Sequence, residues 1–280
     1  MPQIKKYSGK TLSRFAVRYE ADNFFAVRSE AEAVEALKLA KSSGRETVCL
    51  GGGSNVFFAS KKIKSFILKN EIPAEVEYLG GDRFRVSSSV PMIKLLRGIH
   101  SLGRDCFYYL ASAPCQIGGA VAMNAGSGPK EGLSISDFIE SVDAADENSV
   151  KTYAKSELGF GYRNSIFLRE PTRFITSAVF VFPKREMRTN PITERLEWAR
   201  ANQDLSVPNC GSLCNKYNAG ILKFVRAVFK FCPAGLSKKK LNWAYNLSEN
   251  PIWLAAMLKL IKVLHKLAGK ELKFELRIYK

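Results

Sequence analysis

Two glycine-rich segments hold the residues whose types and spacing best suit phosphate binding. In the first, Gly51, Gly52 and Gly53 follow a short apolar run and precede Ser54 and Asn55. Glycine permits positive φ angles and lets backbone N–H groups approach an anion, because no Cβ stands in the way. The segment is neither a G-x-G-x-x-G dinucleotide fingerprint nor a P-loop with its lysine. Taken alone, it favours a structural turn.

The second segment, CQIGGAVAMNAGSG, changes that balance. We expect it to form another loop with an accessible backbone, built around Gly118, Gly119, Asn124, Gly126 and Gly128. Two such loops suit an elongated ligand with a diphosphate in its middle. The pair therefore favours a phosphate cradle over an isolated turn.

Periodicity predicts the elements that position these segments. Apolar residues at helical spacing, between a cap at Ser29 and a stop at Gly44, predict a helix ahead of the first glycine loop. Strands are expected at 47–50, 64–70, 82–90 and 172–183. Further helices are expected near 91–103, 192–204 and 251–269, and a final strand over 271–280. The chain thus alternates helices and strands without a repeat.

Composition limits the class of protein. With 280 residues and 46% hydrophobic content, the chain is expected to fold into a globular protein. No apolar run approaches the roughly 18 residues that a membrane span requires, and no signal-peptide core is seen. We therefore expect a soluble, cytoplasmic protein without integral membrane contact. The six cysteines suggest reduced thiols, and Cys210 and Cys214 lack the further ligands of a metal site.

The formal charge of +17 is concentrated in the last third of the chain. From Pro183 onward, 19 Lys and Arg residues stand against 7 Asp and Glu residues. The positive electrostatic field of these residues would attract a nucleotide substrate, a nucleic acid or an acidic membrane surface. Lysines also recur at helical spacing at Lys259, Lys262, Lys266 and Lys270. The favoured interpretation of this stripe is the solvated face of an amphipathic helix.

A series of motifs resembles the UDP-N-acetylenolpyruvoylglucosamine reductase family (UDP-N-acetylmuramate dehydrogenases, MurB), flavoenzymes of bacterial peptidoglycan synthesis. In chain order they are LGGGSNVFFA, SAPCQIGGAVAMNAGS, FGYRNSIF, CGSLCNK, NWAYN and LKFELRI, and they span nearly the whole chain. The resemblance implies an α+β fold with a two-part FAD-binding region of the PCMH/MurB type, residues 1–70 and 71–183. It also implies a C-terminal α+β substrate-binding domain, residues 184–280, that closes over the substrate.

The same resemblance implies FAD and NADPH as cofactors and a UDP-linked amino sugar as substrate, with no nucleic-acid partner. NADPH would reduce the flavin, and the enolpyruvyl ether would then take a hydride from the flavin and a proton from the protein. The residues implied to bind FAD are Gly51, Gly52, Gly53, Ser54, Asn55, Ser112, Pro114, Gly118, Gly119, Asn124 and Gly126.

Three residues match the family's catalytic positions. Arg163 in GYRNS matches the arginine that grips the substrate carboxylate, and Ser212 in CGSLC matches the proton donor. Glu275 in KFELRI matches the glutamate that stabilises the intermediate. Each has a structural alternative, as a salt-bridge arginine, a turn cap and a solvated strand residue, but their order and shared context favour catalysis. The implied substrate contacts are Tyr162, Lys216 and Asn246.

The chain also departs from the family pattern. Arg18 and Tyr19 stand where relatives have a glycine pair, and Cys115 replaces the glycine after Pro114. Between the CGSLC and NWAYN motifs, the acidic and glycine-rich pattern of relatives is largely lost. These changes leave two alternatives to the reductase open. One is a related FAD-dependent oxidoreductase that acts on another sugar or alcohol, and the other is a non-catalytic relative that binds an anion.

Overall fold

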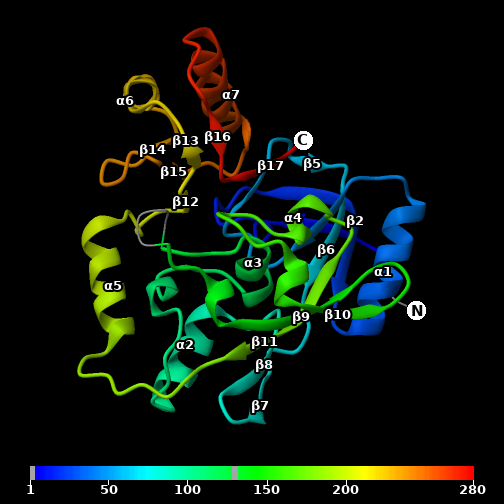
Figure 1. Ribbon diagram of the computed structural model, residues 1–280. Coiled ribbons are helices and arrows are strands. Elements are labelled where there is room, and N and C mark those ends of the chain that lie inside the picture. Colours follow the sequence, from blue (N-terminus) through cyan, green and yellow to red (C-terminus); the bar gives the residue numbers. More distant parts are fainter. Residues whose placement is uncertain (1–3, 128–131) are drawn as a thin grey trace. The chain divides into compact units, whose positions relative to one another are not determined.

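The computed structural model describes residues 4–127 and 132–280, and its contacts divide the chain into two compact units (Figure 1). Unit 1 comprises Met1–Lys5, Asn23–Gly51 and Ser65–Glu197, and unit 2 comprises Lys6–Asp22, Gly52–Lys64 and Trp198–Lys280. Each unit is therefore assembled from segments that are separate in the sequence. The three-part division at residues 70 and 183 stays a prediction.

A small parallel sheet occupies the N-terminal part of unit 1. Strand β6 (Phe66–Asn70) lies between β2 (Tyr19–Val27) and β3 (Thr47–Leu50). Helix α1 (Glu30–Ser42) connects β2 to β3; the Ser29 hydroxyl caps its start by accepting from the Glu32 N–H, and Gly44 follows its end at φ +63°. The expected helix and strands are confirmed here. The first residues of β2 belong to unit 2, where they pair with β5 (Lys62–Ile63).

The second sheet of unit 1 is antiparallel and carries the larger core. Its order is β10 (Val150–Ala154), β9 (Ile139–Ala145), β11 (Phe174–Val181), β8 (Arg83–Ser87) and β7 (Val76–Gly80). Phe107, Phe180 and Phe182 are fully buried, and the last two rings stack at 5.4 Å. The helices of this part are α2 (Met92–Ser101), η1 (Tyr108–Leu110), α3 (Ile117–Ala122), η2 (Ile135–Phe138), η3 (Lys155–Leu158), α4 (Ile166–Arg169) and α5 (Pro191–Asn202).

Unit 2 is built from short strands and two helices. Its strands are β1 (Lys5–Gly9), β4 (Val56–Phe58), β12 (Asn209–Gly211), β13 (Cys214–Lys216), β14 (Ala234–Leu236), β15 (Trp243–Asn246), β16 (Lys273–Phe274) and β17 (Arg277–Tyr279). Strands β12, β15 and β14 form one sheet, β13 pairs with β16, and β17 runs parallel to β4. Helices α6 (Ala219–Val228) and α7 (Ile252–Leu267) pack against each other and against β14.

Two sequence-based expectations are wrong in detail. Gly118 and Gly119 lie in helix α3 instead of a loop, because Ile117, Ala120 and Val121 form a buried stripe at helical spacing. The final strand expected over 271–280 is interrupted, since the N–H groups of Glu275 and Leu276 both donate to the Leu213 carbonyl. The predicted Gly128 lies outside the described residues.

The other helices and strands expected from the sequence are confirmed. Helices α2, α5 and α7 and strands β8 and β11 lie where periodicity places them, and the α+β class is confirmed. Among the residues that the structure describes, no helix has the length and apolarity needed to cross a membrane.

Candidate functional site

The first glycine loop is shaped by a close backbone approach. Gly53 has φ +67°, and a Cβ added there would lie 2.4 Å from the Leu12 carbonyl oxygen. The Gly53 carbonyl accepts a hydrogen bond from the Arg14 N–H at 3.0 Å. Both the backbone angle and the space therefore require glycine at this position. Gly52 and Ser54 flank it in unit 2, while Gly51 belongs to unit 1.

Asn55 connects this loop to the C-terminal motif within unit 2. Its Nδ2 donates to the Glu275 carbonyl at 2.9 Å, and its own carbonyl accepts from the Arg277 N–H at 3.0 Å. The neighbouring Ser54 carbonyl accepts from the Cys210 thiol at 3.0 Å. The loop therefore fixes the backbone around Glu275, in addition to the cofactor contact predicted for Asn55.

Ser212 and Glu275 are brought close together in unit 2. Strand β12 ends at Gly211, directly before Ser212, and the next residue, Leu213, accepts from the Glu275 N–H at 2.9 Å. The Ser212 side chain is half-buried, and among the described residues no hydrogen bond uses its Oγ. The hydroxyl and the carboxylate come from adjacent backbone segments, as a shared site requires.

Trp243 explains why the residue before Ser212 is glycine. A Cβ at Gly211 would lie 2.2 Å from the Trp243 indole, which is 92% buried. The indole Nε1 is itself buried and has no hydrogen-bond partner among the described residues. Trp243 therefore fixes the path of the chain into Ser212.

We predict that Gly211→Ala lowers the free energy of unfolding by about 1–3 kcal/mol or more, because the methyl group overlaps the Trp243 ring. Urea unfolding followed by circular dichroism measures the change. Gly98→Ala is the matched control, since Gly98 lies in α2 with nothing within 4 Å of the added atom. Adding Trp243→Ala to Gly211→Ala should make the combined loss smaller than the sum of the two single losses. Strict additivity would contradict the proposed overlap.

The thiols beside this segment are not poised for chemistry. Burial, together with the charge of Glu275, raises the pKa of Cys210 and of Cys214 to about 12. Both side chains therefore stay protonated at neutral pH and act as buried packing groups. All six cysteines are free, and no cluster of His, Cys, Asp or Glu in the described chain could hold a metal ion.

In unit 1, Arg163 is held by the MNAGS loop. Its guanidinium donates to the carbonyls of Asn124 and Gly126 at 3.2 and 2.8 Å, while Asn124 Nδ2 donates to the Gly161 carbonyl at 3.0 Å. Arg163 and Asn124 both have positive φ, at 51° and 41°. A non-glycine residue with such a positive φ destabilises the folded state by about 1–3 kcal/mol. Such backbone outliers cluster at functional sites. Tyr162 is half-exposed, with its ring 5.3 Å from the Arg163 guanidinium carbon.

Helix α3 and the preceding SSSV segment form a cradle in unit 1. The Gly118 N–H donates to the Ser88 carbonyl at 2.8 Å, and a Cβ at Gly118 would lie 2.8 Å from the Ser88 Cβ. Gly119 faces open space. Ser89 Oγ and Gln116 Oε1 are buried without a hydrogen-bond partner among the described residues. Buried polar atoms of this kind require a partner, so the cradle fits the polar part of a bound cofactor.

Sequence reasoning missed several residues of this region. Ser88, Ser89 and Gln116 were not singled out, although three serines at the end of a strand and a glutamine directly before IGG were available signals. Lys69 was also missed: its ammonium donates to the Gly51 carbonyl, and burial lowers its pKa. A lysine within the apolar run SFILKN was the signal for it.

Some predicted contact residues have other partners here. Ser112 Oγ accepts from Arg195 Nε at 3.2 Å, and Lys216 forms an exposed ion pair with Glu271 at 3.0 Å. Asn246 is buried, and its Nδ2 donates to the carbonyls of Phe15 and Ser248. Pro114 is exposed. The cofactor and substrate contacts of these residues stay predictions.

Asn242, the other asparagine of NWAYN, has a structural role. Its Oδ1 accepts from the Cys214 N–H at 2.9 Å, and its Nδ2 donates to the Cys214 carbonyl at 2.7 Å. Its own carbonyl accepts from the Leu213 N–H at 2.8 Å. Asn242 therefore fixes the backbone that follows Ser212.

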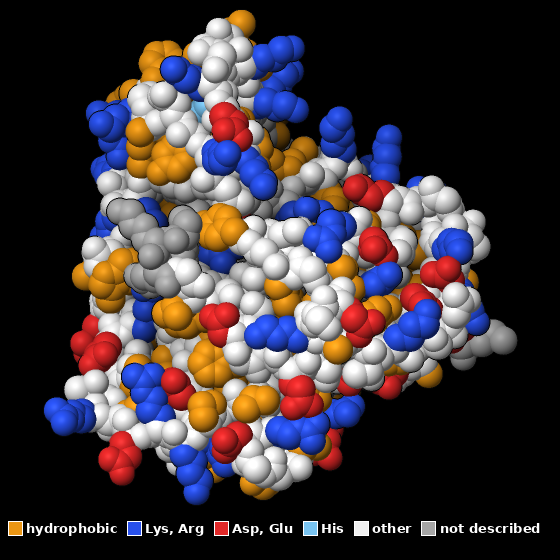
Figure 2. Space-filling model, viewed as in Figure 1, with side chains coloured by type: hydrophobic (Ala, Val, Ile, Leu, Met, Phe, Trp, Pro, Cys, Tyr) orange, Lys and Arg blue, Asp and Glu red, His pale blue; other side chains and the backbone are white. Residues whose placement is uncertain are grey.

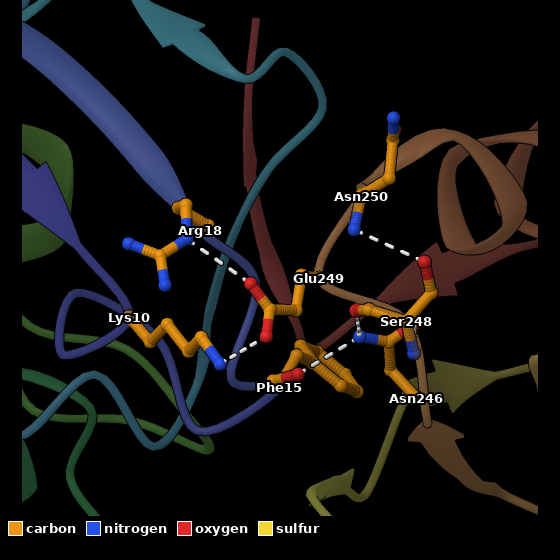
Figure 3. A network of polar contacts seen from close by, with 7 residues as sticks. All are labelled: Lys10, Phe15, Arg18, Asn246, Ser248, Glu249 and Asn250. Atoms are coloured by element: carbon orange, nitrogen blue, oxygen red, sulfur yellow. Dashed lines mark hydrogen bonds and ion pairs between the residues drawn. The ribbon is translucent and has the colours of Figure 1, made fainter.

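The two bulky residues that replace the family's glycine pair are both accommodated. Arg18 and Lys10 bind the same carboxylate, that of Glu249, with Arg18 Nε at 3.0 Å (Figure 3). Tyr19 is fully buried, and its ring meets the Phe58 ring edge-on at 5.3 Å. Packing and an ion pair thus occupy the space that a glycine pair would leave.

Comparisons with known proteins agree with these features. Residues 21–150 match the model of the FAD binding domain family. The UDP-N-acetylenolpyruvoylglucosamine reductase of Chlamydia felis is 30% identical over 202 residues, which is 72% of this chain and 67% of that protein. The corresponding Syntrophotalea carbinolica protein is 28% identical over 210 residues, 73% of this chain and 69% of that protein.

A solved structure supports the same fold. The reductase of this name from Thermus caldophilus superposes with a TM-score of 0.76, covers the whole of both chains and is 20% identical in sequence. At this identity the match shows the fold alone. The antiparallel sheet of unit 1 and the short strands of unit 2 are therefore parts of a known architecture.

Proposed function

Because the chain belongs to the UDP-N-acetylenolpyruvoylglucosamine reductase family, we propose that it uses FAD and NADPH to reduce UDP-N-acetylglucosamine enolpyruvate to UDP-N-acetylmuramate. This reaction serves peptidoglycan precursor synthesis, and we place it in the cytoplasm. The observation that carries the proposal is the backbone hydrogen bond from Glu275 to Leu213, which joins the chain segment that follows Ser212 to the segment of Glu275. The division into FAD-binding parts 1–70 and 71–183 and a substrate-binding part 184–280 belongs to the same proposal.

The cofactor fits the residues that the structure provides. In unit 1, Ser89 Oγ and Gln116 Oε1 are buried without a hydrogen-bond partner among the described residues, so they suit hydroxyl or N–H groups of a bound FAD. In unit 2, the tight turn at Gly53 suits binding of a phosphate by the backbone. When bound, FAD supplies the hydride that NADPH delivers to the enzyme. The protein must bind the substrate, stabilise charge and provide a proton.

Each predicted catalytic residue has a distinct task in this reaction. Hydride addition to the methylene carbon builds negative charge on an enolate stabilised by the substrate carboxylate, which the Arg163 guanidinium binds. The bonds from Arg163 to Asn124 and Gly126 orient that guanidinium beforehand. Ser212 Oγ then protonates the adjacent carbon. Glu275 stabilises the intermediate, and its backbone is fixed by Asn55.

Anaerobic half-reactions test the proposal. The purified protein should be yellow with stoichiometric FAD, NADPH should bleach its flavin absorption band, and the enolpyruvyl UDP-sugar should restore the band. Reduced flavin that ignores this sugar but reacts with another sugar or alcohol would favour a related oxidoreductase. A colourless protein that takes up no FAD would rule out every flavoenzyme assignment.

A further inference from the structure

One stretch of unit 2 has an unusually one-sided charge. Residues 205–270 contain eleven Lys and Arg residues and a single acidic residue, Glu249. Glu249 is already paired with Lys10 and Arg18 (Figure 3). The helices α6 and α7 lie in this stretch and carry none of the residues matched to catalysis. The positive charge of these two helices therefore favours binding of an anionic partner other than the substrate.

Helix α6 has apolar residues on its buried face and on an exposed face. Leu222, Val225 and the adjoining Phe229 are buried in unit 2. On its exposed side, Phe224 and Val228 are 56% and 50% exposed, and Phe231, in the turn after the helix, is 91% exposed. Phe224 and Val228 are four residues apart, which places them on one side of the helix. Lys223 is exposed next to Phe224 in the sequence, and the Lys230 ammonium lies 5.1 Å from the centroid of the Phe231 ring.

Helix α7, which packs against α6, exposes a basic face with apolar residues between its lysines. Its inner side holds Leu254, Met257, Leu258, Ile261 and His265. Its outer side exposes Lys259, Lys262, Val263, Lys266 and Leu267, of which Leu267 is 78% exposed. No carboxylate of the described residues pairs with these lysines. Figure 2 shows blue and orange side chains interleaved over the region that α6 and α7 occupy in Figure 1.

We propose that α6 and α7 together form a docking surface for an anionic lipid bilayer. We call it the α6–α7 surface and define it by Phe224, Val228, Phe231, Lys259, Lys262 and Lys266. Apolar side chains flanked by lysines suit the boundary between headgroups and acyl chains, where the rings are buried and the ammonium groups meet phosphates. Each lysine near such a surface strengthens binding about fivefold. The protein thus binds the bilayer peripherally, independently of its reductase activity.

Other occupants explain the same residues less well. A second copy bound through this surface would place lysines against lysines, which opposes association. A nucleic acid would use the lysines but would leave Val228 and Leu267 exposed without a partner, since aliphatic side chains bind neither phosphates nor base stacks. A bilayer satisfies both the charge and the apolar side chains.

Vesicle flotation tests the proposal with the complete protein. Vesicles of phosphatidylcholine and phosphatidylglycerol should carry the protein upward, vesicles of phosphatidylcholine alone should carry much less, and added salt should reduce the difference. Lys259→Glu with Lys266→Glu should lower the partition coefficient at least about tenfold. Phe224→Ser with Phe231→Ser should also lower the partition coefficient at least about tenfold, because two aromatic rings no longer enter the bilayer.

Matched variants in unit 1 serve as controls. Lys38→Glu with Lys94→Glu reverses two exposed lysines of α1 and α2, and Leu102→Ser removes an exposed leucine. These variants should partition like the unchanged protein. All variants should keep their flavin absorption and their reduction by NADPH without vesicles, so failure of the proposed reductase activity would be seen separately.

Several results would overturn the proposal. Equal flotation with both vesicle types would show that anionic lipid is not recognised, and equal losses in the unit 1 variants would show that the effect is not local. Tighter binding to duplex RNA or DNA than to the anionic vesicles would assign the surface to nucleic acid. A dimer in sedimentation that Phe231→Ser dissociates would assign it to a second copy.

Discussion

Ser212→Ala is expected to leave reduction of the flavin by NADPH nearly unchanged and to slow reoxidation by the enolpyruvyl UDP-sugar by roughly 10²- to 10⁴-fold. The reason is that the hydroxyl is needed only when the substrate carbon takes up a proton. The substitution removes one oxygen from a half-buried side chain whose Oγ makes no hydrogen bond to another described residue. Stability should therefore change little. Rapid-mixing measurements of the two half-reactions separate these effects.

Ser206→Ala is the control for this experiment. Ser206 also belongs to unit 2, is exposed, and donates its hydroxyl to the nearby Asp204 carboxylate at 3.1 Å. Its loss should leave both half-reactions unchanged. Equal slowing of both half-reactions in Ser212→Ala would show that the serine supports the structure of the segment and does not donate the proton.

Arg163→Ala is expected to produce the second large effect, lowering the rate constant for reoxidation at limiting substrate by roughly 30- to 1,000-fold. The substitution removes the group proposed to bind the substrate carboxylate, and it leaves the Asn124 and Gly126 carbonyls without their donor. Arg163→Lys should recover little of the loss, since an ammonium cannot replace a planar guanidinium that binds several acceptors at once. Rapid mixing of the reduced enzyme with limiting substrate, followed by flavin absorbance over time, gives the rate constant.

The control here is Arg169→Ala, which removes another arginine of unit 1 that donates to a loop carbonyl, that of Gly159, at 3.4 Å. It should leave substrate-dependent reoxidation unchanged. Full recovery of activity by Arg163→Lys would mean that position 163 contributes only charge. Loss of FAD from Arg163→Ala would instead assign the residue to the architecture of the MNAGS loop.

Local patterns predicted the regular elements of this fold well. Ser29 and Gly44 bracket α1 as expected, because capping and positive φ are properties of a few neighbouring residues. At helix α3 the sequence favours a loop, because two adjacent glycines outweigh the apolar stripe around them. The interruption of the final strand at Glu275 could not be predicted for a different reason. The Leu213 carbonyl that accepts from the Glu275 N–H lies far away in the sequence.

The arrangement of the candidate site likewise depends on contacts that local sequence patterns do not reveal. Motifs identified Arg163, Ser212 and Glu275, but not how they are held in place. The carbonyls that orient Arg163, the indole that restricts Gly211 and the amide that anchors Glu275 are all tertiary contacts. Arg18 and Tyr19 could be recognised as departures from the family pattern, but the compensating partner, Glu249, is known only from the fold.

The parallel pairing of β17 with β4 bears on the order in which the protein is made. Strand β4 directly follows the first glycine loop, yet its partner Arg277–Tyr279 is synthesised more than two hundred residues later. During translation, Ser65–Glu197 of unit 1 is available to fold early, whereas Asn55 must wait for Glu275 to emerge from the ribosome. The ordered form of this loop is therefore a late product of synthesis, and a nascent chain should acquire it last.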